Sequence, residues 1–348
     1  MEAWRGSRLA AYLAVACAIV VVFASLYPFS GWKDPGIGLF SFVPGPMPKH
    51  AWIADFFINI AAYLPLGLFI SLSRAGGRSA IPAAFVLCSL LSLCMESLQM
   101  YLPERVASNL DWAANSIGGL VGGVMASAVR RIPLGRLFGL RDAWFLPGSA
   151  GDAGIALLAL WLFTQANPSI PLMGSWVPDP GPLLQHLFIP HRFDLPEALS
   201  IFINLFSFGL VAMLCVRPER TGILPVALAL ILAILVKSSM AGFLLKPSVF
   251  FTWASGEAVA GVAPGLLLLL RIGHLAPKRR ILLAAAAMAA QILFPLVHPD
   301  AAATASNFFL FNWQYGQLPT LNGATFFLAR LWPYLALAYL ALVYRAGP

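Results

Sequence analysis

Acidic, basic and amide side chains gather in one short stretch of a chain that is otherwise strongly apolar. Glu96 and Gln99 are followed by Arg105, Asp111 and Asn115, all within about twenty residues. A carboxylate can transfer a proton or bind a cation, and a guanidinium can bind a carboxylate or a phosphate through two parallel hydrogen bonds. These residue types therefore indicate either a polar ligand site with acid–base capacity or a structural ion-pair cluster.

The composition predicts that these residues lie inside a membrane protein. Hydrophobic residues make up 60% of the 348 residues and charged residues only 10%, whereas soluble domains carry about 25% charged residues. Apolar runs of about 20 residues, the length that a helix needs to cross a bilayer, recur from end to end. We therefore predict an all-α, polytopic helical bundle whose surroundings are the lipid bilayer.

The basic residues orient this bundle rather than indicate a nucleic-acid partner. We predict about ten transmembrane helices, near residues 9–29, 52–73, 80–101, 110–130, 152–167, 195–216, 222–244, 250–271, 281–298 and 325–344. With the N-terminus inside, 15 of the 22 Lys and Arg residues lie on the cytoplasmic side, where membrane proteins carry their excess of positive charge. We expect both termini to be cytoplasmic, and no Lys/Arg-rich stripe with interleaved aromatic residues predicts nucleic-acid binding.

The two halves of the chain are similar to each other. Residues 109–124 align without gaps on residues 250–265, which places Trp112 on Trp253 and, at the same offset, Glu96 on Lys237. We predict a four-helix repeat in residues 1–141, a degenerate second repeat in 142–277 and a C-terminal hairpin in 278–348. Chance similarity between apolar segments is the alternative.

The predicted topology brings polar residues of three helices to the same external end of the bundle. Asp55 and Asn59 open the second helix, one turn apart on one face. Asp111 and Asn115 open the fourth helix in the same way, and Glu96 lies about five residues before the end of the third. An ionisable side chain within a span costs roughly 2.5–3.5 kcal/mol, so a bundle retains one where it is paired or hydrated.

Arg105, between the third and fourth helices, is the predicted counter-charge, because its planar fork can bind two carboxylates. The alternatives are structural. Asp55 and Asp111 can accept hydrogen bonds at the N-termini of their own helices, and Glu96 can belong to a structural ion pair. In the second half, we expect Lys237 to pair with a glutamate, Glu257.

Other patterns favour packing or ordinary surface roles. The glycines between residues 118 and 123 are spaced four apart, which lets helices approach closely. We predict neither a cofactor nor a metal, because the sequence has no dinucleotide-binding, phosphate-loop or metal-ligand pattern. Ser97 lies beside Glu96, but no His in the same segments could activate it as a nucleophile.

The polar residues and glycines of this region resemble the VanZ-like family. In that family a Glu-x-x-Gln closes one helix, and an Arg precedes an Asp-x-x-x-Asn-x-x-Gly helix. The matching residues are Glu96, Gln99, Arg105, Ser108, Asp111, Asn115, Gly118, Gly119 and Gly122, with Asn59, Pro65 and Gly67 upstream. The resemblance covers residues 9–130, and residues 152–271 are similar to a degenerate copy with Thr252 and Gly256 in place of the Asp and Asn.

The resemblance implies a bacterial inner-membrane protein that acts in the cell envelope. The family is named for a member that gives low-level resistance to teicoplanin, a glycopeptide antibiotic that binds cell-wall precursors. This implies a setting rather than a reaction.

Three functions fit the residues and this setting. The first is binding or transport of an anionic, lipid-linked envelope molecule such as a polyprenyl phosphate, at a site built from Arg105, Asn59, Gln99, Asn115 and Asp55. The second is an intramembrane hydrolase or transferase acting on such a lipid, with Glu96 as general acid or base and Asp111 as a second catalytic residue. The third is a scaffold whose polar residues only hold the bundle together.

Overall fold

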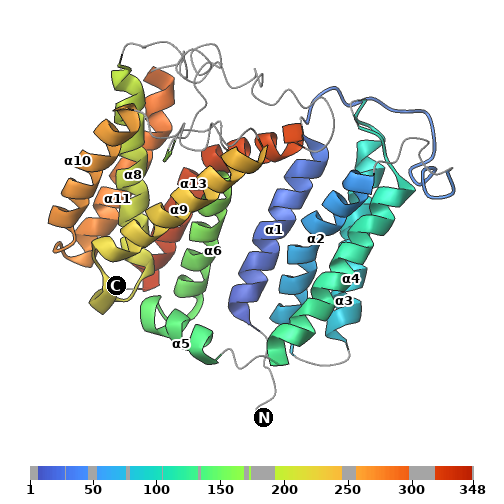
Figure 1. Ribbon diagram of the computed structural model, residues 1–348, viewed down its shortest axis with the longest axis horizontal. Helices are drawn as coiled ribbons and strands as arrows, with labels where there is room; N and C mark the ends of the chain where they lie inside the picture. Colours follow the sequence, from blue (N-terminus) through green and yellow to red (C-terminus); the bar gives the residue numbers. More distant parts are fainter. Residues whose placement is uncertain are drawn as a thin grey trace. The chain divides into compact units, whose positions relative to one another are not determined.

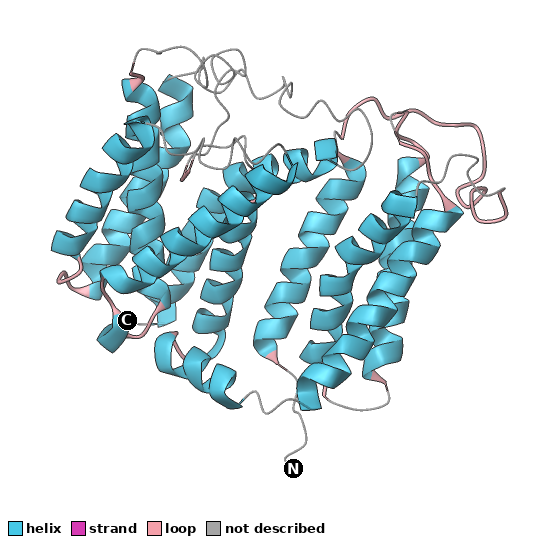
Figure 2. Cartoon of the chain, viewed as in Figure 1, coloured by secondary structure: helices cyan, strands magenta, loops and turns pink. Residues whose placement is uncertain are grey.

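The fold is helical throughout the part of the chain that can be described, as predicted. The computed structural model describes residues 7–27, 29–45, 53–75, 79–103, 105–131, 135–167, 172–173, 193–244, 256–297 and 318–346. Within these ranges there are eleven α-helices, one short 3-10 helix and no strand (Figure 2). Eight helices are long and apolar enough to cross a membrane, which confirms the class of a polytopic membrane bundle.

The chain divides into two compact units, one at each side of residue 140 apart from a short part of the last helix. The first contains α1 (Arg8–Leu26), α2 (Ile53–Ser73), α3 (Ala80–Gln99) and α4 (Asn109–Arg131) (Figure 1). Each follows one predicted apolar run. The predicted division into two repeats and a hairpin stays a prediction.

The second unit is organised around one buried helix, α8 (Leu195–Cys215), which contacts most of the other helices. The remaining helices are α6 (Gly148–Thr164), α9 (Ile223–Leu244), α10 (Gly256–Ile272), α11 (Pro277–Val297) and α13 (Leu318–Ala346), with the 3-10 helix η1 (Pro218–Arg220). The most extensive contacts of α8 are with α10 and α11. Side chains on several faces of α8 are therefore buried, including polar ones in its middle.

A short helix, α5 (Gly135–Trp144), was not predicted. It has only ten residues and contains charged side chains, so it lacks the long apolar run that marks a span. Near its end, Arg141 donates to Asp142 at 2.7 Å and to Asp152 at 2.6 Å. Burial alone would lower the pKa of Arg141, but the carboxylates of Asp142 and Asp152 raise it by a larger amount. The net effect is a raised pKa.

Glycines bring α2 and α4 into backbone contact. A Cβ added to Gly118 would lie 2.5 Å from the carbonyl oxygen of Ile60, and one added to Gly122 would overlap the carbonyl oxygen of Leu64. A Cβ on Gly67 of α2 would meet the backbone of α4 in turn. These glycines therefore have the packing role that the sequence predicted. The close approach also brings the first turns of α2 and α4 together.

Candidate functional site

Three helices of the first unit place polar side chains next to one another. We call this set the polar cluster: Asp55, Asn59 and Tyr63 of α2, Ser92 and Glu96 of α3, and Asp111 and Asn115 of α4. Side chains four residues apart on a helix lie on the same face, so α2 contributes three successive turns and α3 and α4 contribute two each. The structure thus brings Asp55, Asn59, Glu96, Asp111 and Asn115 together, as the sequence predicted.

Glu96 connects the end of α3 to the start of α4. Its side chain is 4% exposed, and its Oε2 accepts a hydrogen bond from the backbone N–H of Ser108 at 2.8 Å. Ser108 Oγ in turn accepts from the N–H groups of Leu110 and Asp111, which makes it the N-cap of α4. In an ordinary capping box, an acid in the first turn of the same helix would bind the cap's N–H. Here a carboxylate from α3 takes that role, and Asp111 faces α2 instead.

The interface of α2 and α4 is acidic. The carboxylate of Asp111 lies close enough to Asp55 and to Glu96 for electrostatic repulsion. The Asn59 amide lies beside Asp111, yet its Nδ2 has no partner with hydrogen-bond geometry among the described residues. Asp55 lies in the first turn of α2, where a carboxylate interacts favourably with the helix dipole.

Two further buried atoms in the polar cluster have no hydrogen-bond partner among the described residues. Asn115 donates from Nδ2 to Ser92 Oγ at 3.0 Å, but its Oδ1 accepts from no described group. The hydroxyl of Tyr63, a residue only 3% exposed, lies beside Ser92 but likewise has no partner with hydrogen-bond geometry among the described residues. Each such buried group costs about 1–3 kcal/mol unless something binds it, so these atoms indicate a place for a bound polar group or for water.

Gln99 and Arg105 lie at the same end of the unit but bind α1. Gln99 Nε2 donates to the carbonyl of Ser25 at 2.8 Å. Arg105 donates to the carbonyls of Tyr27 and Ala24 at 2.9–3.2 Å. These carbonyls end a helix and have no partner within it, and a positive side chain at a helix C-terminus is favourable.

The expected bridging of two carboxylates by Arg105 is not seen. No ion pair joins Arg105 to Asp55, Glu96 or Asp111 among the described residues. Glu96 has the N–H of Ser108 as its partner, and the guanidinium of Arg105 is directed to the end of α1. Whether Arg105 and Gln99 also contact a ligand stays a prediction.

The family comparison covers this first unit. Residues 9–130 match the family model VanZ/LLP1. These residues are VanZ-like. The match includes the whole polar cluster and ends before α5. No curated protein and no solved structure matches the chain.

Sequence reasoning missed two members of the polar cluster in the VanZ-like region. Tyr63 lies four residues after Asn59, and Ser92 lies four residues before Glu96. The same spacing that linked Asp111 to Asn115 predicts both. Neither is ionisable at neutral pH. The acids stood out in the sequence because a charged side chain is costly to place in a membrane, and this argument does not apply to Tyr63 or Ser92.

In the second unit, Lys237, which aligns with Glu96, and the nearby acid Glu257 make different contacts from the VanZ-like acids. Lys237 is 1% exposed, and its Nζ donates to the carbonyl of Asn167 at 2.9 Å. Glu257, equally buried, accepts from the N–H of Asp194 at 3.1 Å. The predicted pairing of Lys237 with Glu257 stays a prediction, as does the second repeat, and Thr252 lies outside the described residues.

Proposed function

We propose that the VanZ-like region binds the polar headgroup of a lipid-linked envelope molecule, such as a polyprenyl phosphate or its glycan-bearing form. The observation that supports this is the set of three buried polar atoms without a described partner, Asn59 Nδ2, Tyr63 Oη and Asn115 Oδ1. They lie among apolar helices long enough to span a membrane. A headgroup that both donates and accepts hydrogen bonds would satisfy all three.

The residues around the cluster suggest how the parts of such a headgroup would be distributed. The acidic interface of Asp55, Glu96 and Asp111 suits hydroxyl or amine donors. Arg105 is half-buried at the same end of the unit, and we assign it to the anionic part, with Gln99 beside it. Following the distribution of Lys and Arg, we place this end at the external side of a bacterial inner membrane, with both termini in the cytoplasm.

Native mass spectrometry of the full chain, released from detergent, tests this proposal. The wild-type protein should retain a lipid of defined mass, and Asn115→Leu and Tyr63→Phe should each reduce its occupancy at least fivefold. Ser127→Ala is the matched control, because it lies on α4 and its hydroxyl binds only its own helix. A wild-type protein that carries bulk phospholipid alone, or variants that retain the lipid, would overturn the proposal.

The second candidate is a scaffold. The contacts of Glu96 and Gln99 favour it because each ties two helices together, and Arg105 ties the loop between α3 and α4 to the end of α1. Under this alternative, Glu96→Gln preserves both fold and function, because a glutamine oxygen can still accept from Ser108. An intramembrane hydrolase or transferase would use the same cluster, with Glu96 as acid or base and Asp111 beside it. Release of product from labelled lipid precursors, abolished in Glu96→Gln, distinguishes that reaction from binding.

A further inference from the structure

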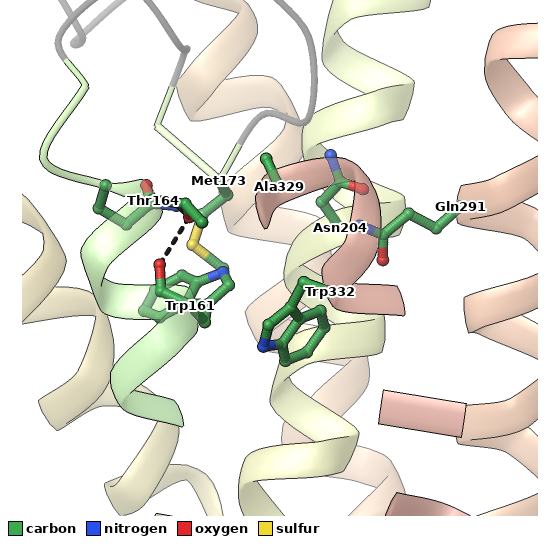
Figure 3. A pocket seen from close by; sticks show the side chains of 8 residues that line it. Trp161, Thr164, Met173, Asn204, Gln291, Ala329 and Trp332 are labelled. Atoms are coloured by element: carbon green, nitrogen blue, oxygen red, sulfur yellow. Dashed lines mark hydrogen bonds between the residues drawn. The ribbon is translucent and has the colours of Figure 1, made fainter. Parts of the chain in front are cut away.

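The second unit contains a small buried cavity that is separate from the polar cluster. It lies among α6, α8, α11 and α13, with Met173 over one side (Figure 3). Its lining consists of Trp161, Thr164, Gln165, Met173, Asn204, Gln291, Ala329 and Trp332. The free space is about 10 Å³, which suits one group of the size of a water molecule.

Two indole rings form rigid apolar walls. Trp161 stacks on Phe208 with ring centroids 3.7 Å apart. Trp332 donates from Nε1 to the carbonyl of Leu157 at 2.9 Å. Both rings are therefore held in place by neighbours outside the cavity, and they leave apolar surface toward it.

The polar lining is made of amides and a hydroxyl, and no lining residue is charged. Gln165 is 1% exposed, and its Nε2 donates to Thr164 Oγ1 at 3.1 Å. Its Oε1 has no hydrogen-bond partner among the described residues. Gln291 is oriented by Ser207, which donates to its Oε1 at 2.8 Å. The group that the cavity lacks is thus a hydrogen-bond donor.

Met173, one of the lining residues, has an unusual backbone conformation. Its φ is 62°, in the left-handed region that residues other than glycine rarely adopt. It is only 1% exposed, and it lies beside Trp161 (Figure 3). Such a conformation costs about 1–3 kcal/mol and persists where the surroundings enforce it, often at binding sites.

We infer that this cavity binds one hydroxyl group of a neutral, polyhydroxylated headgroup, a sugar or a glycerol. A hydroxyl supplies the donor that Gln165 Oε1 lacks, and its size fits the free space. An anion would find no cation in the lining, and an ammonium would find no carboxylate. The indoles would contact the carbon that carries this hydroxyl, and the rest of the headgroup would lie outside the free space. This site is independent of the function proposed for the polar cluster.

The test is native mass spectrometry of the full chain in an amine-oxide detergent, titrated with octyl glucoside or with monooctanoylglycerol. Binding should saturate at one adduct, and Gln165→Met should weaken it about tenfold. Ala329→Val, which reduces the free space from α13, should weaken it as well. Octyltrimethylammonium should give no saturable adduct, and Glu96→Gln, in the other unit, should leave the titration unchanged.

The two probes separate the sources of the hydroxyl. Saturation by the glucoside alone assigns a sugar, and saturation by the glyceride alone assigns a glycerol. If Gln165→Met does not fold, two measurements still test the inference: saturation of the wild-type protein at one adduct, and weaker binding by Ala329→Val. The inference fails if neither probe saturates, if both variants bind like wild type, or if high-resolution density with probe present shows a single water at Gln165.

Discussion

The ends of α1 in the VanZ-like region and α6 in the second unit are closed by different residues. Carbonyls at the end of α1 accept from Gln99 and from Arg105, which lies in a connecting loop. The carbonyl of Asn167, just after α6, accepts from Lys237, which lies within α9. In the first unit the positive charge comes from a loop arginine, and α3 has a carboxylate, Glu96, at the position aligned with Lys237.

The packing of the helices differs in a related way. In the VanZ-like region, Gly67, Gly118 and Gly122 bring the backbones of α2 and α4 together. In the second unit, Gly261 of α10 approaches the backbone of α8, with 2.6 Å from an added Cβ to the carbonyl oxygen of Ala198, whereas Gly265 faces the Leu205 side chain at 3.0 Å. A side chain can move and a backbone cannot. The α2–α4 pair has three glycines against backbone and the α8–α10 pair has one, and the polar cluster lies beside the α2–α4 pair.

The largest effect is expected for an alanine at the tight helix pair. Gly122→Ala would place a Cβ against the backbone of Leu64 and Leu68 and should lower the free energy of unfolding by about 3 kcal/mol. Gly265→Ala, the matched change in the second unit, should lower it by less than about 1 kcal/mol. Thermal unfolding in detergent measures both. Equal losses would contradict the difference in packing.

Glu96 separates a structural role from a binding role. Glu96→Leu removes the acceptor of the buried Ser108 N–H and should destabilise the protein by about 1–3 kcal/mol. Glu96→Gln keeps an acceptor and should unfold close to the wild-type temperature, but with reduced lipid occupancy. Thermal unfolding and native mass spectrometry on the same samples test this pair. Full lipid occupancy in the stable Gln variant would favour the scaffold.

Arg105 supplies the positive charge and the hydrogen bonds at the end of α1. Arg105→Gln removes the positive charge from the end of α1 and should cost about 1 kcal/mol in stability, since the side chain is half-buried. We also expect loss of a phosphate-bearing lipid. Hydrogen exchange of the amides near the end of α1, together with lipid occupancy, reports both effects. Unchanged exchange there would show that the carbonyl contacts contribute nothing.

The smallest effect is expected at the cap of α4. Ser108→Ala removes the Oγ acceptor for the N–H groups of Leu110 and Asp111 but keeps the backbone donor to Glu96. A loss of about 0.5–1 kcal/mol is expected, with lipid binding retained. Loss of lipid in a normally stable Ser108→Ala protein would place the hydroxyl itself in the binding site.

Much of the fold was predictable because membrane helices have a simple signal. All ten predicted apolar runs contain a helix, since lipid allows no other satisfied backbone along such a run. The convergence of α2, α3 and α4 was predicted from the spacing of Asp55, Asn59, Asp111 and Asn115 and from the position of Glu96 near the end of its helix. The partners of Arg105 could not be predicted, because backbone carbonyls have no signature in the sequence. The contact of Glu96 with Ser108 was hidden for the same reason.

The most direct test of the account is a high-resolution cryo-EM map of the full chain in nanodiscs made from native bacterial lipid extract. We expect elongated density whose polar end lies about 3 Å from Asn115 Oδ1 and Tyr63 Oη, the hydrogen-bond distance. Water-sized density alone at these atoms, with each of them satisfied, would contradict it.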